Sequence, residues 1–143
     1  MSLYLDTEFD GHGGDLISLA LAGNDGSHWY GVFNDCRFSD EWVREHVSPL
    51  IYAMKPTVQG DPHVLRFSLK EYLSTREGYT IWADWPADFE YLMQLMRGSH
   101  YGESFVIPCT MQLIVTPDGE IKPEIPHNAL SDAVALMRWH NRA

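Results

Sequence analysis

The chain has 143 residues, of which 20 are acidic and 10 basic, so its formal net charge is −10. Its apolar (45%), aromatic (13%) and charged (21%) fractions are globular values that exclude a disordered, collagen-like or coiled-coil chain. The length predicts one domain over residues 1–143, and the charge excludes a non-specific polyanion binder unless bound cations reverse the local sign.

The first part of the chain predicts an antiparallel meander. Residues 3–8 are expected to form a short strand, and the glycine-rich residues 10–15 a turn. Residues 16–22 are almost continuously apolar, as in a central strand that is covered on both faces. The turn signal at residues 24–26 leads into a third strand over residues 28–33.

The middle of the chain predicts two helices separated by a loop. Ser39 precedes acidic residues and an apolar pattern, which indicates a helix start, and Pro49 limits that helix. Residues 56–63 contain two prolines and a glycine and are expected to be loop. A second helix is expected over residues 69–75, with Ser68 as its cap.

The last part of the chain alternates between strand and helix. Residues 78–84 predict a fourth strand, and residues 86–96 a helix that ends at Gly98. Residues 104–116 are rich in β-forming residues, and residues 128–141 predict the final helix. A meander followed by alternating elements predicts an α/β fold, with a mixed sheet that has helices on its faces.

The lack of a recognisable sorting signal and the pattern of the cysteines predict a cytoplasmic protein. Cys36 and Cys109 stand in unrelated contexts, which is typical of two reduced thiols and not of a disulfide framework or a CxxC metal motif. The N-terminus meets Asp6 at once and has no basic region, so no signal peptide is expected. No apolar run approaches the roughly 18 residues of a membrane span, so no membrane partner is expected.

Two carboxylates end the first predicted strand. Side chains alternate across a strand, so Asp6 and Glu8 point to one face and Thr7 to the other. Adjacent carboxylates raise each other's pKa unless a cation joins them. A metal site and a solvated strand end are both compatible with this motif alone.

A second acidic pair follows the fourth predicted strand. Asp84 ends that strand, and Asp88 falls in the first turn of the next helix, where the helix dipole favours a carboxylate. Ordinary helix capping is the alternative for Asp84. Capping explains Asp88 less well, because ligands gather at the carboxyl ends of strands in α/β sheets.

A histidine and an acid flank the start of the last helix. His127 lies on the loop that enters the helix, and Asp132 lies within it, so both side chains can reach one pocket. The alternative is that Asn128 caps the helix and Asp132 is exposed to solvent.

Together the three segments resemble the DnaQ-like, or DEDDh, 3′-5′ exonucleases of the ribonuclease H-like superfold. The motifs are LYLDTEF at residues 3–9, ADWPADFEYL at residues 83–92 and HNALSDA at residues 127–133. The first is similar to that of short stand-alone exoribonucleases of bacteria and phage. The chain departs from the family at Asp84, where the pattern commonly has Asn.

The resemblance implies a mixed five-stranded sheet and a 3′-5′ exoribonuclease that releases 5′-mononucleotides from a single-stranded 3′ end. It implies two divalent cations, and carboxylates select Mg²⁺ or Mn²⁺ over zinc. The expected metal ligands, which are also catalytic, are Asp6, Glu8, Asp88 and Asp132. His127 is the expected general base, because it would take a proton from the attacking water.

Three aromatic residues beside the motifs are candidates for stacking on RNA bases. Phe9 follows the first motif, and Trp85 and Phe89 flank Asp88. A core position is the alternative for Phe89, because it shares a helix face with Leu92.

Other functions remain open from the sequence. A DNA exonuclease would need the same carboxylates, and no residue reads the 2′-OH that separates RNA from DNA. A catalytically silent binding module and an acidic metal-binding protein are further alternatives. A homodimer is compatible with the small size of the chain.

Overall fold

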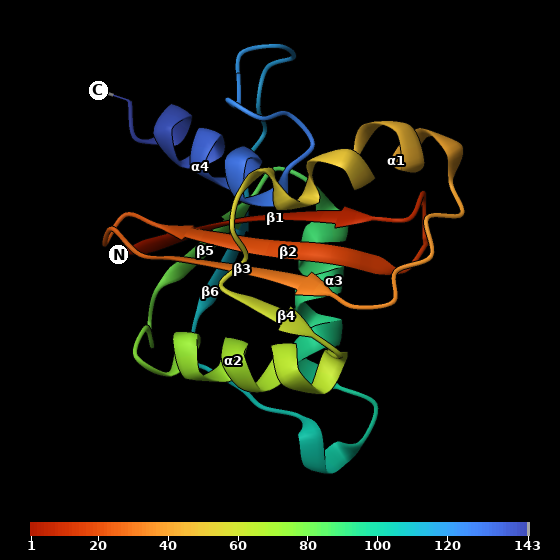
Figure 1. The fold of residues 1–143 in the computed structure, drawn as a ribbon. Helices are drawn as coiled ribbons and strands as arrows, with labels where there is room; N and C mark the ends of the chain where they lie inside the picture. The colour runs from red at the N-terminus through yellow and green to blue at the C-terminus, as the bar shows by residue number, and fades with distance from the viewer. Residues whose placement is uncertain (143) are drawn as a thin grey trace.

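The computed structural model describes residues 1–142, which form one mixed sheet covered by helices on both faces (Figure 1). The strands are β1 (Ser2–Phe9), β2 (Leu16–Gly23), β3 (His28–Phe33), β4 (Val58–Gly60), β5 (Thr80–Ala83) and β6 (Thr110–Leu113). The helices are α1 (Glu41–His46), α2 (Pro62–Ser74), α3 (Pro86–Arg97) and α4 (Ala129–His140), with 3-10 turns η1 (Ser48–Ala53) and η2 (Tyr101–Glu103).

The strand order is β4-β3-β2-β1-β5-β6. Strands β1, β2 and β3 pair antiparallel, whereas β4, β5 and β6 each pair parallel to a neighbour. The α/β class and the predicted order, a meander followed by parallel strands, are therefore confirmed, but the sheet has six strands in place of five.

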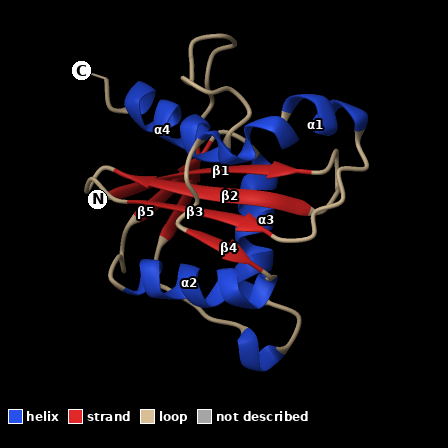
Figure 2. Cartoon of the chain, viewed as in Figure 1, coloured by secondary structure: helices blue, strands red, loops and turns tan. Residues whose placement is uncertain are grey.

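Two apolar layers follow from the alternation of side chains along the strands. Leu3 and Leu5 of β1 pack with α2 and α3 on one face. Ala20 and Tyr30 belong to the opposite cluster, beneath α1, η1 and α4. Strand β2 is buried along nearly its whole length, as its continuous apolar run predicts. Figure 2 shows the same sandwich, with helices on both sides of the strands.

The predicted loop over residues 56–63 is wrong, because it contains β4 and the start of α2. Asp61 caps α2 by accepting from the backbone N–H of Val64 at 2.9 Å, and Pro62 fills the first helical position. Proline is favoured there, since its missing N–H would have no partner in the helix. Ser68 therefore lies inside α2 and does not cap it.

Most other predicted elements shift only at their ends, but of the β-rich residues 104–116 only Thr110–Leu113 form a strand, β6. Asp40, and not Ser39, caps α1 through the backbone N–H of Val43 at 3.0 Å. Helix α3 ends at Gly98, whose φ of +70° suits a residue without a Cβ. Within residues 1–142, no helix is long and apolar enough to cross a membrane.

Candidate active site

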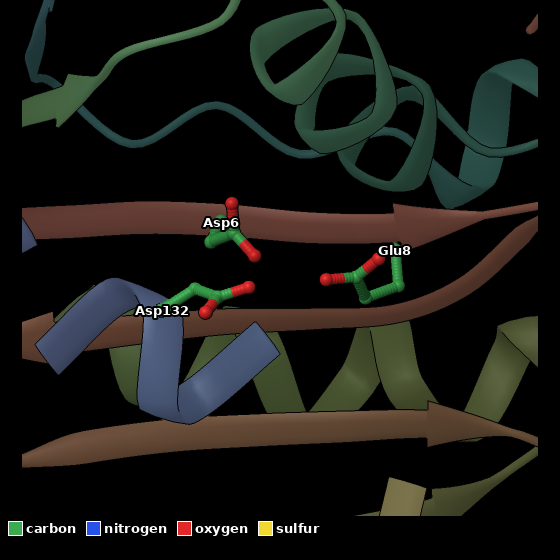
Figure 3. Close-up of side chains that lie close together, drawn as sticks. All are labelled: Asp6, Glu8 and Asp132. Atoms are coloured by element: carbon green, nitrogen blue, oxygen red, sulfur yellow. The ribbon is translucent and has the colours of Figure 1, made fainter. Parts of the chain in front are cut away.

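Asp6, Glu8 and Asp132 bring three carboxylates together above the sheet (Figure 3). Asp6 and Glu8 lie two residues apart on β1 and face the same side, and Asp132 points at them from the first turn of α4. One carboxylate oxygen of each lies within 4.8 Å of the others. A β-bulge in the pairing of β1 with β2, between Glu8 and Phe9, lies beside this group.

A second group joins Asp6 to Asp84 and Asp88, again with carboxylate oxygens within 4.8 Å of one another. Asp84 directly follows β5, and Asp88 lies in the first turn of α3. The Thr7 hydroxyl, on the opposite face of β1, donates to Oδ1 of Asp88 at 2.6 Å and holds that side chain in place. Asp6 therefore belongs to both groups.

Burial sets the charge of these acids. Burial first, and then the charge of Asp88, raise the pKa of Asp6 well above its ordinary range. Burial and the neighbouring Asp132 raise the pKa of Glu8 to about 9. Burial also raises the pKa values of Asp88 and Asp132 to about 7. Without a cation, the group therefore retains protons near neutral pH.

The donor atoms fit a divalent cation. Oδ2 of Asp6 and Oδ2 of Asp88 are buried and have no hydrogen-bond partner in the described chain. A buried carboxylate oxygen without a partner is costly, and a cation removes that cost. Both groups offer oxygen donors alone, the donor type that Mg²⁺ and Mn²⁺ prefer.

His127 lies at the entry to α4 with a left-handed backbone, φ +68°. Its ring packs edge-on against the indole of Trp42, with 4.9 Å between ring centroids. Burial is the largest influence on the pKa of Asp132, and a hydrogen bond from the His127 backbone opposes it. The backbone of His127 thus contacts Asp132 of the acidic group, and its ring contacts α1.

Asn128 fixes the start of α4, as the capping alternative proposed. Its side chain accepts from the backbone N–H of Ser131 at 3.1 Å and donates to the Leu50 carbonyl at 2.9 Å. The other half of that alternative is wrong, because Asp132 faces the carboxylates and is not exposed to solvent. The cap therefore orients Asp132 toward Asp6.

An open cleft of about 470 Å³ leads to the carboxylates. It is lined by three carboxylates, those of Asp6, Glu8 and Asp88, and by His12. Its aromatic lining residues are Phe9, Trp42 and Trp85. A cavity of about 480 Å³ between α4 and the preceding loop contains none of the five carboxylates. A smaller cavity of about 230 Å³ is lined by Asp84 and Asp132, and Asp6 borders both this cavity and the cleft. The carboxylates therefore lie between the two openings.

The three predicted stacking residues differ in their surroundings. Trp85 is 61% exposed at the cleft. Phe9 lines the cleft and stacks on Tyr91, with ring centroids 4.8 Å apart. Phe89 packs against the apolar cluster beneath the sheet, which is the core alternative that its helix face suggested.

Trp42 is a cleft residue that the sequence did not single out as functional. The apolar pattern that follows Ser39 consists of Trp42, Val43 and Val47, and it predicts that all three residues pack inward. In the structure only Val43 and Val47 are buried, whereas Trp42 is 49% exposed. Adjacent residues on a helix are about 100° apart, so the Val43–Val47 pair already turns Trp42 outward. That spacing is the signal that could have identified it.

The turn after β1 holds α1 against the cleft. The Asp10 carboxylate accepts from the backbone N–H groups of Ser39 and Asp40, each at 2.9 Å. Gly11, with φ +77°, lies against the Asp40 side chain, where a Cβ would come within 2.9 Å of it. Trp42 is therefore positioned by a residue that immediately follows the first acidic motif.

Comparison with known proteins gives relatives along almost the whole chain. No protein-family model matches the sequence. The curated proteins 3′-5′ exoribonuclease Rv2179c and 3′-5′ exoribonuclease MT2234.1, from two strains of Mycobacterium tuberculosis, are each 30% identical over 157 aligned residues. The alignments cover 96% of this chain and 90% of each relative.

Proposed function

The chain belongs to the family of these mycobacterial 3′-5′ exoribonucleases, and on that premise we propose that it is a metal-dependent 3′-5′ exoribonuclease. It removes 5′-mononucleotides from a single-stranded 3′ end of RNA, and residues 1–143 act as one exonuclease domain. Within the ribonuclease H-like superfold we assign it to the DnaQ-like, DEDDh group, on the three motifs that begin with DTEF.

One observation carries the proposal: two groups of three carboxylates share Asp6 and contain buried oxygens without partners. Such a group is unfavourable unless it holds cations. Two Mg²⁺ or Mn²⁺ ions, when bound, would stabilise the charge on the attacking and leaving oxygens of an in-line displacement. Asp6, Glu8, Asp88 and Asp132 would hold them.

The chain's own residues have separate roles in this reaction. His127 takes the proton of the attacking water at a ring nitrogen, supported by its contact with Trp42. Thr7 keeps Asp88 in place through its 2.6 Å hydrogen bond. Trp85 and Phe9 stack on bases at the 3′ end, because both line the cleft next to the carboxylates.

An exonuclease assay with matched RNA and DNA tests the proposal. Single strands labelled at the 5′ end are incubated with the protein and Mg²⁺, Mn²⁺ or EDTA. The expected result is an RNA ladder that shortens from the 3′ end and is abolished by EDTA. Faster shortening of the DNA would make the protein a DNA exonuclease. No turnover of either strand would leave a silent binding or metal-binding protein.

A further inference from the structure

Asp84 is a carboxylate that helix capping does not explain. It directly follows β5 and precedes α3, where a capping acid would stand. The N-cap position is held by Trp85, however, and no side chain makes a capping hydrogen bond there. The carboxylate of Asp84 is instead one of the three that converge with Asp6 and Asp88.

Strand register brings Asp84 beside Asp6. Strands β1 and β5 pair parallel, and Tyr4 is opposite Trp82. Two residues further along each strand, Asp6 and Asp84 reach the same face, because side chains alternate with a period of two. The sheet therefore presents two neighbouring carboxylates on its α4 side, where Asp6 also meets Glu8 and Asp132.

Asp88 adds an independent sign of a ligand. Its side chain is nearly fully buried, with the residue only 2% exposed. Oδ1 accepts from the Thr7 hydroxyl, whereas Oδ2 is buried and has no partner. That free oxygen belongs to a carboxylate within 4.8 Å of those of Asp6 and Asp84. A buried acceptor in this position needs a donor or a cation, and its acidic neighbours supply no donor when ionised.

We propose that Asp84 is a fifth metal ligand, which completes a second three-carboxylate site with Asp6 and Asp88. The inference rests on the proposed function. It adds that the protein forms the second cation site by itself, without ligands from the substrate. A site with three protein carboxylates does not depend on substrate phosphates for its ligands. Both cations therefore bind before RNA does.

Manganese titration without nucleic acid tests this assignment. Free Mn²⁺ is followed by its electron paramagnetic resonance signal while the ion is added to the full chain. Wild-type protein should bind two Mn²⁺ per chain. Asp84→Asn should retain one of them unchanged and bind the other at least about 10-fold more weakly, since even indirect partners of ligands contribute 10–100-fold.

Two further variants make the result specific. Asp118→Asn removes the same charge from an exposed turn and should bind both ions like wild type. Glu8→Gln should weaken the ion that Asp84→Asn leaves unchanged, so the double variant should lose both. Thermal unfolding in EDTA checks folding, and relief of repulsion among the acids should keep Asp84→Asn at least as stable as wild type.

The outcomes separate this inference from the proposed function. Unchanged binding of two ions by Asp84→Asn would overturn the role of Asp84, and so would a wild-type protein that binds one ion. Neither result would contradict the proposed exonuclease activity, which the RNA assay tests separately. Conversely, loss of one ion in Asp84→Asn, together with no hydrolysis by wild type, would keep the site and overturn the nuclease.

Discussion

Two clusters join β1, β5 and α4 on the same face of the sheet, and they differ in whether their polar atoms are paired. In the cluster at the amino ends of the strands, the Tyr4 hydroxyl lies 2.6 Å from Nδ1 of His140. The His140 ring packs on Trp82, with 4.5 Å between centroids, and the Trp82 indole N–H donates to Ser2. These polar side chains are therefore paired with one another.

The other cluster begins two residues further along each strand. Asp6 follows Tyr4, Asp84 follows Trp82, and α4 contributes Asp132. Here buried carboxylate oxygens lack partners and burial raises their pKa values. The comparison teaches that the same elements can hold a stabilising contact at one end and a destabilising group at the other, as the proposed cation site requires.

Removing Asp6 should have the largest effect. Asp6→Asn should abolish detectable RNA hydrolysis, because Asp6 belongs to both groups of carboxylates. Removing even one stabiliser of transition-state charge costs about 10²–10³-fold. The metal-free variant should melt at a higher temperature than wild type, because it relieves repulsion among buried acids. End-labelled RNA and thermal unfolding in EDTA measure the two effects, and Asp118→Asn is the control. A lower melting temperature in EDTA would contradict the comparison.

Replacing His127 should affect activity, whereas replacing His140 should affect stability. His127→Ala should slow hydrolysis roughly 10²–10⁴-fold, as for a lost general base, and leave Mn²⁺ affinity unchanged. His140→Ala, the matched control from the paired cluster, should lower stability and leave the rate nearly intact. Single-turnover rates and Mn²⁺ titrations test both variants. Loss of Mn²⁺ in His127→Ala would show that the ring holds a cation and not a proton.

Stability should fall with rising pH when no metal is bound, and metal should remove most of this dependence. The pKa values of Asp88 and Asp132 rise from 3.8 to about 7, and that of Glu8 from 4.5 to about 9. The unfolded chain ionises first, so stability in EDTA is fully present below about pH 4 and is lost as the pH rises toward 9.

Thermal unfolding at pH 5 and pH 8 measures this effect. A loss of a few kcal/mol corresponds to a melting temperature lower by roughly 5–10 °C at pH 8, at about 2–4 °C per kcal/mol. Mn²⁺ should remove most of the difference, because it stabilises the ionised carboxylates. Asp10 does not interfere, since backbone N–H groups, that of Asp40 first, lower its pKa and confine its effect to more acidic solutions. Equal stability of the EDTA protein at both pH values would contradict the raised pKa values.

Breaking the paired cluster should have the smallest effect. Tyr4→Phe removes the hydroxyl that contacts His140 and should cost about 1 kcal/mol, or roughly 2–4 °C in melting temperature, with RNA hydrolysis near normal. Tyr101→Phe, at a side chain that is 99% exposed, is the control. A large loss of activity in Tyr4→Phe would mean that the two clusters are coupled.

Alternation along strands made most of the fold and the acidic groups predictable. The period of two assigns Asp6 and Glu8 to one face, and the carboxyl end of β5 identifies Asp88. Strand β4 was missed because its three residues carry no pattern of their own and pair only at the edge of the sheet. The start of α2 is not predictable from this pattern, because Pro62, which is common in loops, occupies its first helical position.

Other features depend on tertiary structure. Asp84 fits a cap and a ligand equally well in sequence, and only its neighbours distinguish the two. The left-handed backbone of His127 has no sequence signal, since residues other than glycine rarely adopt it. The His127 ring packs against Trp42 and His46, which are distant in sequence, so its environment is set by tertiary structure.

The carboxylate of Asp10 has a mechanical consequence. Helix α1 has six residues, fewer than an isolated helix needs to persist in water. Its first turn is anchored to the end of β1 by the two bonds that Asp10 accepts. Helix α1, which forms one wall of the cleft, is thus fixed to the end of the strand that carries Asp6 and Glu8. This wall can move away from the carboxylates only if the hydrogen bonds accepted by Asp10 break.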